Sequence, residues 1–370
     1  MTHIFISFLF YNIILFIFYV QYRRGLYYIN KQHLVFYTVL LIAFGTYGGG
    51  EGDYLHYKEI VEEIHTLGDV FIYTSMEKQY NYLAYLLDGN YHLWRFIVYS
   101  IQFIGLGWFL KKAKLNTYPV LVTFTSLFLV TSVYGRVYWG GIYYFMGLYL
   151  LIEKKNPFYL IAILLCFVSH TSNLILIALL PLGFIRLRRW YFLIIICSAG
   201  IILALFNDYF NLLIESGGVD GAEYLNSKLS NYSKSTNYLN NFFGNSIGEK
   251  IIFLLRHIPI LFILLSIFKL FMTSYNRYKS IYKPLQRVIN VYLGINLVAL
   301  VFLFADMNNG TYFYRVLAMT FFPLTLILPS MIRIGNLRAK TFNLYILMFI
   351  LTTEASYFKD LYYAYSEGNF

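Results

Sequence analysis

The sequence predicts an all-α, polytopic integral membrane protein with about ten to twelve transmembrane helices, and three observations carry this prediction. The 370 residues are 59% hydrophobic and only 13% charged, with a mean hydropathy of +0.59. Apolar runs of about 17–20 residues, enough to cross a bilayer core of about 30 Å as a helix, recur along the chain. Basic and acidic residues alternate between successive connections of these runs. A soluble globular domain does not have this composition.

The apolar runs define the predicted spans in chain order. We expect them at residues 3–20, 34–46, 91–110, 118–133, 137–152, 158–184, 190–206, 251–271, 288–305, 316–332 and 342–357. Together they form a single membrane domain over residues 1–370, with long loops at about residues 47–90 and 207–250.

The distribution of charge predicts how the chain threads the membrane, because Lys and Arg near span ends are retained on the cytoplasmic side. Six connections hold 19 of the 29 Lys and Arg and a single acid, Glu153. The loop at 47–90 has eight acids against two lysines, so both long loops are expected to face outward. The net charge of +11 therefore reflects the orientation of the chain in the membrane. The basic residues are dispersed over several short loops, which argues against nucleic-acid binding.

Residues 158–184 leave two alternatives open. Basic residues at both ends predict the same membrane side, which requires an even number of crossings. A hairpin or re-entrant loop breaking near residues 169–173 would satisfy this rule and would place His170 at its outward tip. One long tilted helix would violate the rule and would point His170 into the bundle.

Four arginines fall near the outward ends of the predicted spans: Arg95, Arg136, Arg256 and Arg315. The planar guanidinium stays charged and donates paired hydrogen bonds, which suits a phosphate or diphosphate. The structural alternative is that these side chains reach lipid headgroups or cap helix carbonyls. His170 has the titration range of a general base, and an interhelical hydrogen bond is its structural alternative.

The start of the first outward loop combines glycines with carboxylates. Glu51 and Asp53 follow Gly48-Gly49-Gly50, and without the Lys-Ser/Thr pair this is no phosphate-binding P-loop. Either acid would orient an acceptor sugar hydroxyl, pair with an arginine or solvate a turn. We expect no disulfide, no metal and no cofactor, because Cys166 and Cys197 lie within spans and the histidines lack ligand spacing.

Five short motifs, in order, resemble the EpsG/Wzy-type polysaccharide polymerases of bacterial membranes. The sequence has Asp53-Tyr54-Leu55-His56-Tyr57 in the first outward loop and Glu77-Lys78-Gln79-Tyr80 before the third span. Arg136 opens the fifth span, Phe167-Val168-Ser169-His170-Thr171-Ser172 follows, and Tyr314-Arg315 comes late in the chain. The resemblance extends over nearly the whole length.

This resemblance implies a glycosyltransferase that joins repeat units carried on undecaprenyl diphosphate at the outer face of the bacterial plasma membrane. Arg136 and Arg315 would stabilise the departing diphosphate, His170 would deprotonate the acceptor or orient the diphosphate, and Asp53 would orient the acceptor or act as an alternative base. Substrate contacts are expected from Arg95, Arg256, Glu51, Tyr54, Tyr57, Tyr138 and Tyr314.

The expected partners are the lipid-linked oligosaccharide, the bilayer, a chain-length regulator and a flippase. Three other interpretations stay open: a ligase that moves finished glycan from the same lipid, a more distant integral-membrane O-acyltransferase, and a flippase or exporter of lipid-linked glycan. The class of polysaccharide, whether capsule, O-antigen or exopolysaccharide, is also open.

Overall fold

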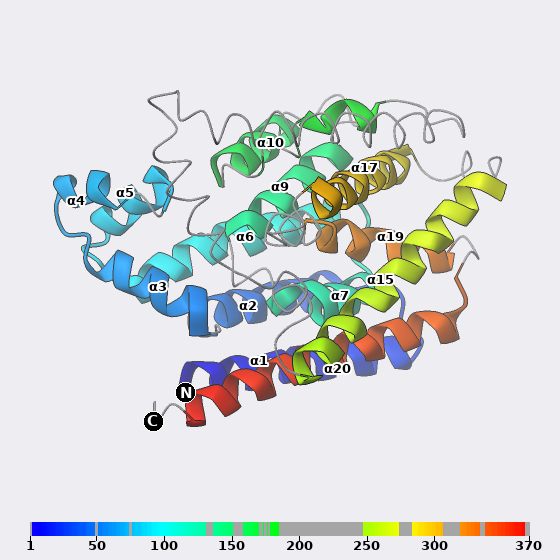
Figure 1. The fold of residues 1–370 in the computed structure, drawn as a ribbon, viewed down its shortest axis with the longest axis horizontal. Helices are drawn as coiled ribbons and strands as arrows, with labels where there is room; N and C mark the ends of the chain where they lie inside the picture. Colours follow the sequence, from blue (N-terminus) through cyan, green and yellow to red (C-terminus); the bar gives the residue numbers. More distant parts are fainter. Residues whose placement is uncertain are drawn as a thin grey trace. The chain divides into compact units, whose positions relative to one another are not determined.

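The computed structural model describes residues 2–48, 51–73, 76–130, 136–150, 158–169, 173, 176, 178–184, 247–273, 283–305, 319–333 and 337–366 (Figure 1). Within them the secondary structure is helical, without strands, and Tyr28 and Thr117 form one isolated antiparallel β-bridge. The elements are α1 (Thr2–Arg23), α2 (Lys31–Tyr47), α3 (Glu51–Glu62), α4 (Leu67–Ile72), α5 (Lys78–Leu86), α6 (Tyr91–Lys112), α7 (Tyr118–Thr123), the π-helix η1 (Phe124–Leu129), α9 (Arg136–Leu150), α10 (Phe158–Ser169), the 3₁₀ helix η3 (Leu180–Gly183), α15 (Ile247–Thr273), α17 (Lys283–Ala305), α19 (Phe321–Arg333) and α20 (Ala339–Ser366).

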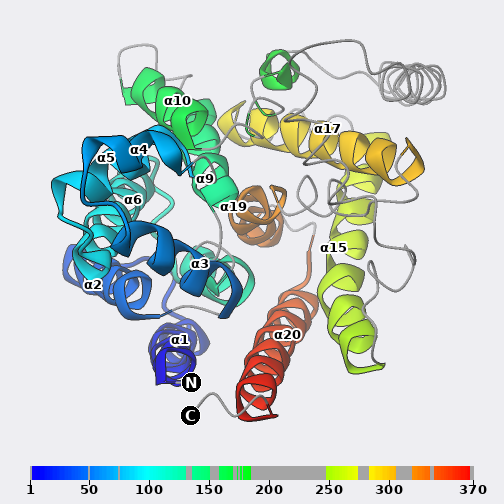
Figure 2. The same cartoon turned by 60° about the vertical axis from the view of Figure 1, so that its left-hand side comes forward.

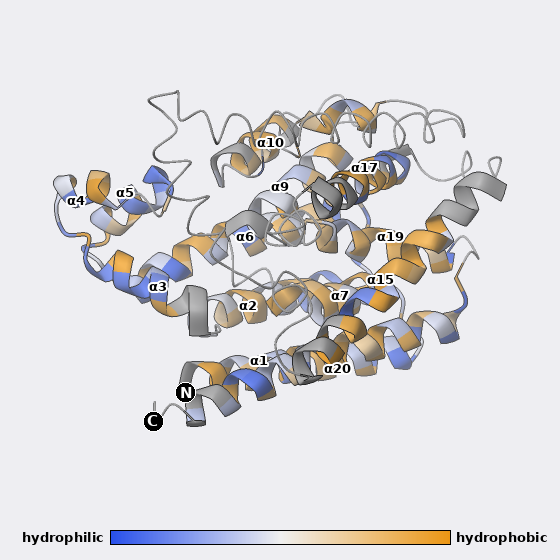
Figure 3. Ribbon diagram, in the orientation of Figure 1, coloured by the Kyte–Doolittle hydropathy of each residue, from blue (hydrophilic) through white to orange (hydrophobic). Residues whose placement is uncertain are grey.

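The predicted class, an all-α polytopic membrane protein, is confirmed. Among the described helices, Ile4–Arg23 and Tyr91–Lys112 are long and apolar enough to cross a bilayer, and shorter apolar helices lie at 118–129, 254–267, 285–299 and 321–333. Helix α1 leaves Phe5 and Phe16 55% and 70% exposed, which suits contact with lipid chains. Figure 3 shows hydrophobic residues along α2, α10 and α15, and more hydrophilic ones on α3. The span expected at 190–206 lies outside the described residues.

The chain divides into two compact units. Unit 1 comprises residues 1–178, 283–285 and 321–370, and unit 2 comprises residues 179–282 and 286–320. In unit 2, the Arg287 guanidinium lies 4.6 Å from the centroid of the Phe184 ring, and the Asn290 amide donates to the Leu182 carbonyl at 3.4 Å. These contacts join the start of α17 to the segment around η3.

Helices α1 and α20 of unit 1 run antiparallel along each other. Ser7 Oγ lies 2.8 Å from Tyr357 Oη, and at the opposite ends Tyr22 Oη donates to Asn343 Oδ1 at 3.0 Å. Helix α2 packs along α6, and α9 along α10. The helices of unit 1 therefore share two ends, which differ in chemistry.

We call the end formed by residues 21–31, 111–118 and 333–340 the basic end. It has nine Lys and Arg and no acid, and all nine side chains are exposed. Backbone hydrogen bonds join its first two segments, from Ile29 N to the Asn116 carbonyl at 3.0 Å and from Tyr118 N to the Tyr27 carbonyl at 2.9 Å. The Asn116 side-chain amide also donates to the Ile29 carbonyl at 2.8 Å.

We call the opposite end, where α3, α4 and α5 lie, the capped end. Figure 2 turns it forward and shows these three helices in front of α2 and α6. The connection at 47–90, expected to face outward, lies here, and most of its described residues are helical. The helices form because Ile60, Val61, Ile64, Val70 and Ala84 are buried together and remove a small apolar core from water.

Helix α10 ends at Ser169, and the described residue 173 and residues 180–183 are in 3₁₀ conformation. No unbroken α-helix therefore extends through the described residues of 158–184, which favours the interrupted alternative over one long tilted helix. His170 itself lies outside the described residues.

Candidate functional site at the capped end

The centre of the capped end of unit 1 is Arg95, in the second turn of α6. Its side chain is 2% exposed. Nε donates to the Gly45 carbonyl at 2.8 Å, NH2 makes short contacts to the carbonyls of Gly45 and Gly48, and NH1 donates to Tyr91 Oη at 3.3 Å. Because the last carbonyls of a helix have no intrahelical donor and carry partial negative charge, this guanidinium caps α2.

Aromatic rings enclose that guanidinium and complete what we call the Arg95 shell, formed by Tyr80, Tyr91, Trp94, Tyr99 and Trp139. The guanidinium carbon lies 5.5 Å from the Tyr91 ring centroid and 5.3 Å from that of Tyr99, within cation–π range. Trp139 contacts Tyr80 and Tyr99 edge-on, each at 5.5 Å. Trp94 Nε1 donates to the Tyr80 carbonyl at 3.1 Å. The shell thus joins α2, α5, α6 and α9.

The acidic motif begins directly beyond this shell. Helix α3 starts at Glu51, which places Asp53 and Tyr54 in its first turn, five and six residues after the capped Gly48 carbonyl. Tyr57 follows one turn later and is half-buried. The side chains of Glu51, Asp53 and Tyr54 lie outside the described part of the structure, so their roles stay predictions.

Helix α9 brings a second predicted motif to the same shell. It begins at Arg136, and three residues later Trp139 is 2% exposed against Tyr80 and Tyr99. The shell therefore fixes the first turn of α9, in which Arg136 and Tyr138 lie. The side chains of these two residues are not among those described.

Asn173, the residue directly after the Phe167–Ser172 motif, contacts the next turn of α9 at Gly140. A methyl group built on Gly140 would overlap the Asn173 side chain, so the helix surface and the amide are in direct contact. Asn173 is fully buried, and its Nδ2 donates to the Cys166 carbonyl at 3.3 Å. His170 precedes Asn173 by three residues in the sequence and lies outside the described residues, so its role stays a prediction.

The remaining predicted residues are not gathered here by described contacts. Arg315 and Tyr314 lie outside the described residues. Arg256 lies within α15 in unit 2 and is half-buried. Their substrate roles stay predictions, as does substrate contact by Arg95, whose geometry favours the structural alternative of helix capping.

Sequence reasoning did not identify Gly45 and Gly140, and it named Asn173 only as part of the expected break at residues 169–173; all three make close contacts at this end. A side chain on Gly45 would overlap the Tyr99 ring, so glycine is what allows α6 to approach α2. Glycine within an apolar span is the only sequence signal for such a contact, and it does not identify the partner.

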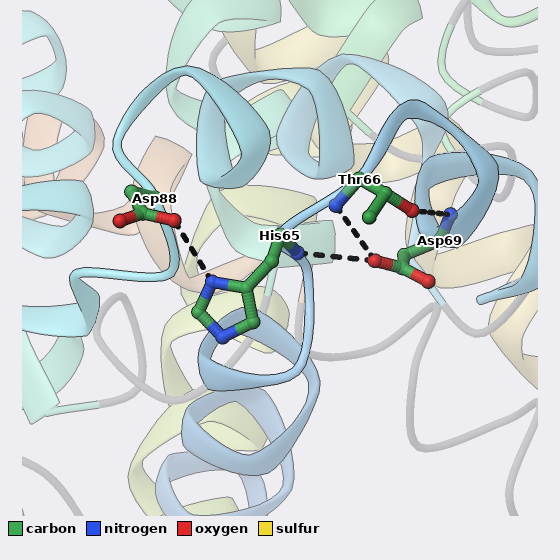
Figure 4. A network of polar contacts seen from close by, with 4 residues as sticks. All are labelled: His65, Thr66, Asp69 and Asp88. Atoms are coloured by element: carbon green, nitrogen blue, oxygen red, sulfur yellow. Dashed lines mark hydrogen bonds and ion pairs between the residues drawn. The ribbon is translucent and has the colours of Figure 1, made fainter.

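A polar network at the edge of the cap links its helices (Figure 4). His65 Nδ1 lies 2.9 Å from Asp88 Oδ1, which joins the α3–α4 connection to the α5–α6 turn. This hydrogen bond raises the pKa of His65. Asp69 accepts from the backbone of Thr66 at 2.7 Å in a capping box, and this bond lowers its pKa.

Comparison with known proteins gives one match, to the model of the EpsG family, over residues 26–369. No curated protein and no solved structure matches the chain. The matched region covers all five motifs, the capped end, and the basic end from residue 26 onward.

Proposed function

Because this chain belongs to the EpsG family, we propose that it is a membrane glycosyltransferase that joins oligosaccharide repeat units carried on undecaprenyl diphosphate. Family membership supports the coarser statement, a polysaccharide polymerase-type function in the membrane. The lipid-diphosphate donor and action at the outer face of the bacterial plasma membrane are our extension. The acidic loop 47–90 and the basic connections support the orientation.

The proposed reaction is a single displacement at an anomeric carbon. A sugar hydroxyl of the incoming unit attacks the anomeric carbon of the growing chain, and a new glycosidic C–O bond forms. The C–O bond to the lipid diphosphate breaks, and the diphosphate leaves with the bonding electrons. The hydroxyl proton passes to a base on the protein, for which His170 and Asp53 are the candidates.

Arg136 and Arg315 are the groups that we propose to stabilise the leaving diphosphate. Negative charge develops on its bridging oxygen as the bond breaks, and a guanidinium held in place lowers that energy without reorganising. The donor is already activated as a diphosphate ester, so the reaction needs no nucleotide sugar.

The observation that best supports this proposal is that residues next to three of the motifs meet at the capped end. Arg95 binds the Gly48 carbonyl, five residues before Asp53, and Trp139, three residues after Arg136, contacts Tyr99 of the Arg95 shell. Asn173, three residues after His170, lies against Gly140 of the same helix as Trp139. Motifs more than 30 residues apart in sequence would then serve one substrate.

The test is mass spectrometry of lipid-linked glycans from a deletion strain complemented with the wild type, Arg136→Ala or His170→Ala. Arg24→Ala is the matched control, because Arg24 is exposed at the basic end. We expect single repeat units to accumulate without polymer in the deletion and in the two site variants, and normal polymer with the control.

Other outcomes identify the competing functions. Accumulation of long lipid-linked chains would indicate a ligase. Single units that a membrane-impermeant glycosidase cannot reach in intact spheroplasts would indicate a flippase. Normal polymer in the deletion strain would contradict all three.

A further inference from the structure

We infer that Arg95 is a positioning residue for the acidic motif, acting through the α2 terminus instead of binding the diphosphate. This inference rests on the proposed function, because it assigns Arg95 a part in the same site. The partners of the Arg95 guanidinium N–H groups support this role.

Arg95 directs four hydrogen bonds inward, three of them to main-chain carbonyls of Gly45 and Gly48. A guanidinium has five N–H donors in a rigid fork. The side chain is 2% exposed, and two tyrosine rings lie within 5.5 Å of the guanidinium carbon, so the guanidinium is shielded from solution. Burial of an arginine is costly, and the carbonyl contacts compensate part of its desolvation.

The contacts fix the point at which the chain leaves α2. Gly48 N donates to the Phe44 carbonyl at 2.7 Å, and the Gly48 carbonyl accepts from Arg95, so both sides of this residue are held. Helix α3 begins at Glu51, three residues after Gly48, so the bond from Arg95 limits the positions that the start of the acidic motif can take.

Lysine cannot reproduce this arrangement. Its ammonium is a point charge and lacks the planar fork that reaches two carbonyls at once. Arg95→Lys keeps the positive charge near the site but releases at least one carbonyl, so it separates positioning from charge. Arg24→Lys, at an exposed residue of the basic end, is the matched control.

The experiment measures elongation by the purified full chain in liposomes, with the lipid-linked fraction that accumulates in the deletion strain as substrate. We expect Arg95→Lys to lower kcat by about 10- to 100-fold, as small displacements of a reacting group do. The KM for the lipid-linked fraction should stay within about twofold, because the variant loses no contact with the lipid-linked substrate.

A double-mutant cycle with Asp53→Asn measures the coupling in kcat between the two residues. A residue that only stabilises the fold would show no such coupling. If Arg95 acts through the acidic motif, Arg95→Lys/Asp53→Asn should be no slower than Asp53→Asn alone. The inference is wrong if the falls in kcat of the two single variants multiply in the double variant. It is also wrong if the main effect of Arg95→Lys is a rise in KM, which would indicate diphosphate binding.

Hydrogen exchange provides a measurement that does not depend on activity. Arg95→Lys should speed backbone exchange in peptides covering residues 45–57 and leave residues 10–20 unchanged, whereas unchanged exchange in 45–57 would overturn the inference. If Arg95→Lys does not fold, Tyr91→Phe removes one Arg95 partner and keeps the ring. A fall in kcat at constant KM then supports positioning, and wild-type kinetics or a raised KM refutes it.

Failure of the proposed function would look different. If the wild type does not elongate the lipid-linked fraction, the polymerase assignment fails, while the exchange measurement still decides whether Arg95 orders residues 45–57.

Discussion

The two ends of unit 1 use the same residue type in opposite ways. At the basic end, nine Lys and Arg are exposed on short connections, and backbone bonds such as Ile29 N to the Asn116 carbonyl hold the loops together. At the capped end, Arg95 is buried, and its side chain donates hydrogen bonds to carbonyls at the end of α2 and to the Tyr91 hydroxyl. Exposed charge sets orientation in the membrane, whereas buried charge organises the chain around a site.

The largest effect should come from filling the closest contact at the capped end. Gly140→Ala would force the Asn173 amide out of its buried position, which we expect to cost about 1–3 kcal/mol of stability. It should also abolish polymer, because Gly140 lies four residues after Arg136 and Asn173 three residues after His170, the two residues that we propose for the reaction. Thermal unfolding in detergent and polymer analysis of the complemented strain measure the two effects.

The neighbouring glycine is a matched control for this prediction. A methyl group on Gly141 meets nothing within 4 Å among the described residues, and alanine is the better helix former by up to about 1 kcal/mol. Gly141→Ala should therefore keep stability and polymer. Equal losses in both variants would show that glycine at the start of α9 serves something other than the Asn173 contact.

A smaller effect, on stability alone, is expected at the basic end. Asn116→Ala removes the bond to the Ile29 carbonyl, which should cost about 1 kcal/mol and lower the melting temperature. Gln32→Ala, at an exposed neighbour, should leave it unchanged. Polymer length should be normal in both variants. Loss of polymer in Asn116→Ala at unchanged stability would place part of the site at this end and remove the contrast.

Much of the helical framework follows from the sequence, because a bilayer leaves a spanning chain few alternatives to a helix. The apolar runs predicted at 91–110 and 342–357 correspond to α6 and to part of α20, which extends to Ser366. The charge pattern likewise anticipates the composition of the basic end. Both predictions rest on local composition, which a single sequence displays directly.

The cap and the Arg95 shell depend on contacts between distant residues, and these the sequence does not display. Helices α3 to α5 have only 12, 6 and 9 residues, too few to show a clear hydrophobic period, and the burial of Val61 and Val70 is seen only in the structure. The position of Arg95 near a span end is compatible both with ligand binding and with capping of helix carbonyls. Only the Gly45 and Gly48 carbonyls, 47 to 50 residues away, distinguish the two.

The smallest effect should be a pH dependence confined to the edge of the capped end. The hydrogen bond that His65 donates to Asp88 raises the folded pKa of His65, so this bond stabilises the α3–α4 and α5–α6 junction fully below the ordinary histidine value of about 6.5. The contribution is lost as the pH rises through the raised value. Asp69 has a lowered pKa, so its contribution changes only in acid, as the pH falls through that lowered value.

Hydrogen exchange at pH 6 and pH 8, corrected for intrinsic rates, measures this effect. Peptides covering residues 61–69 and 85–91 should be more protected at pH 6, and Asp88→Asn should remove the difference. Asp69→Asn, which weakens the Thr66 capping box, should reduce protection equally at both values. Because His65 is exposed, the stability of the whole chain should not change with it. A pH dependence that reached residues 45–57 would mean that the edge network, and not Arg95 alone, orders the acidic motif.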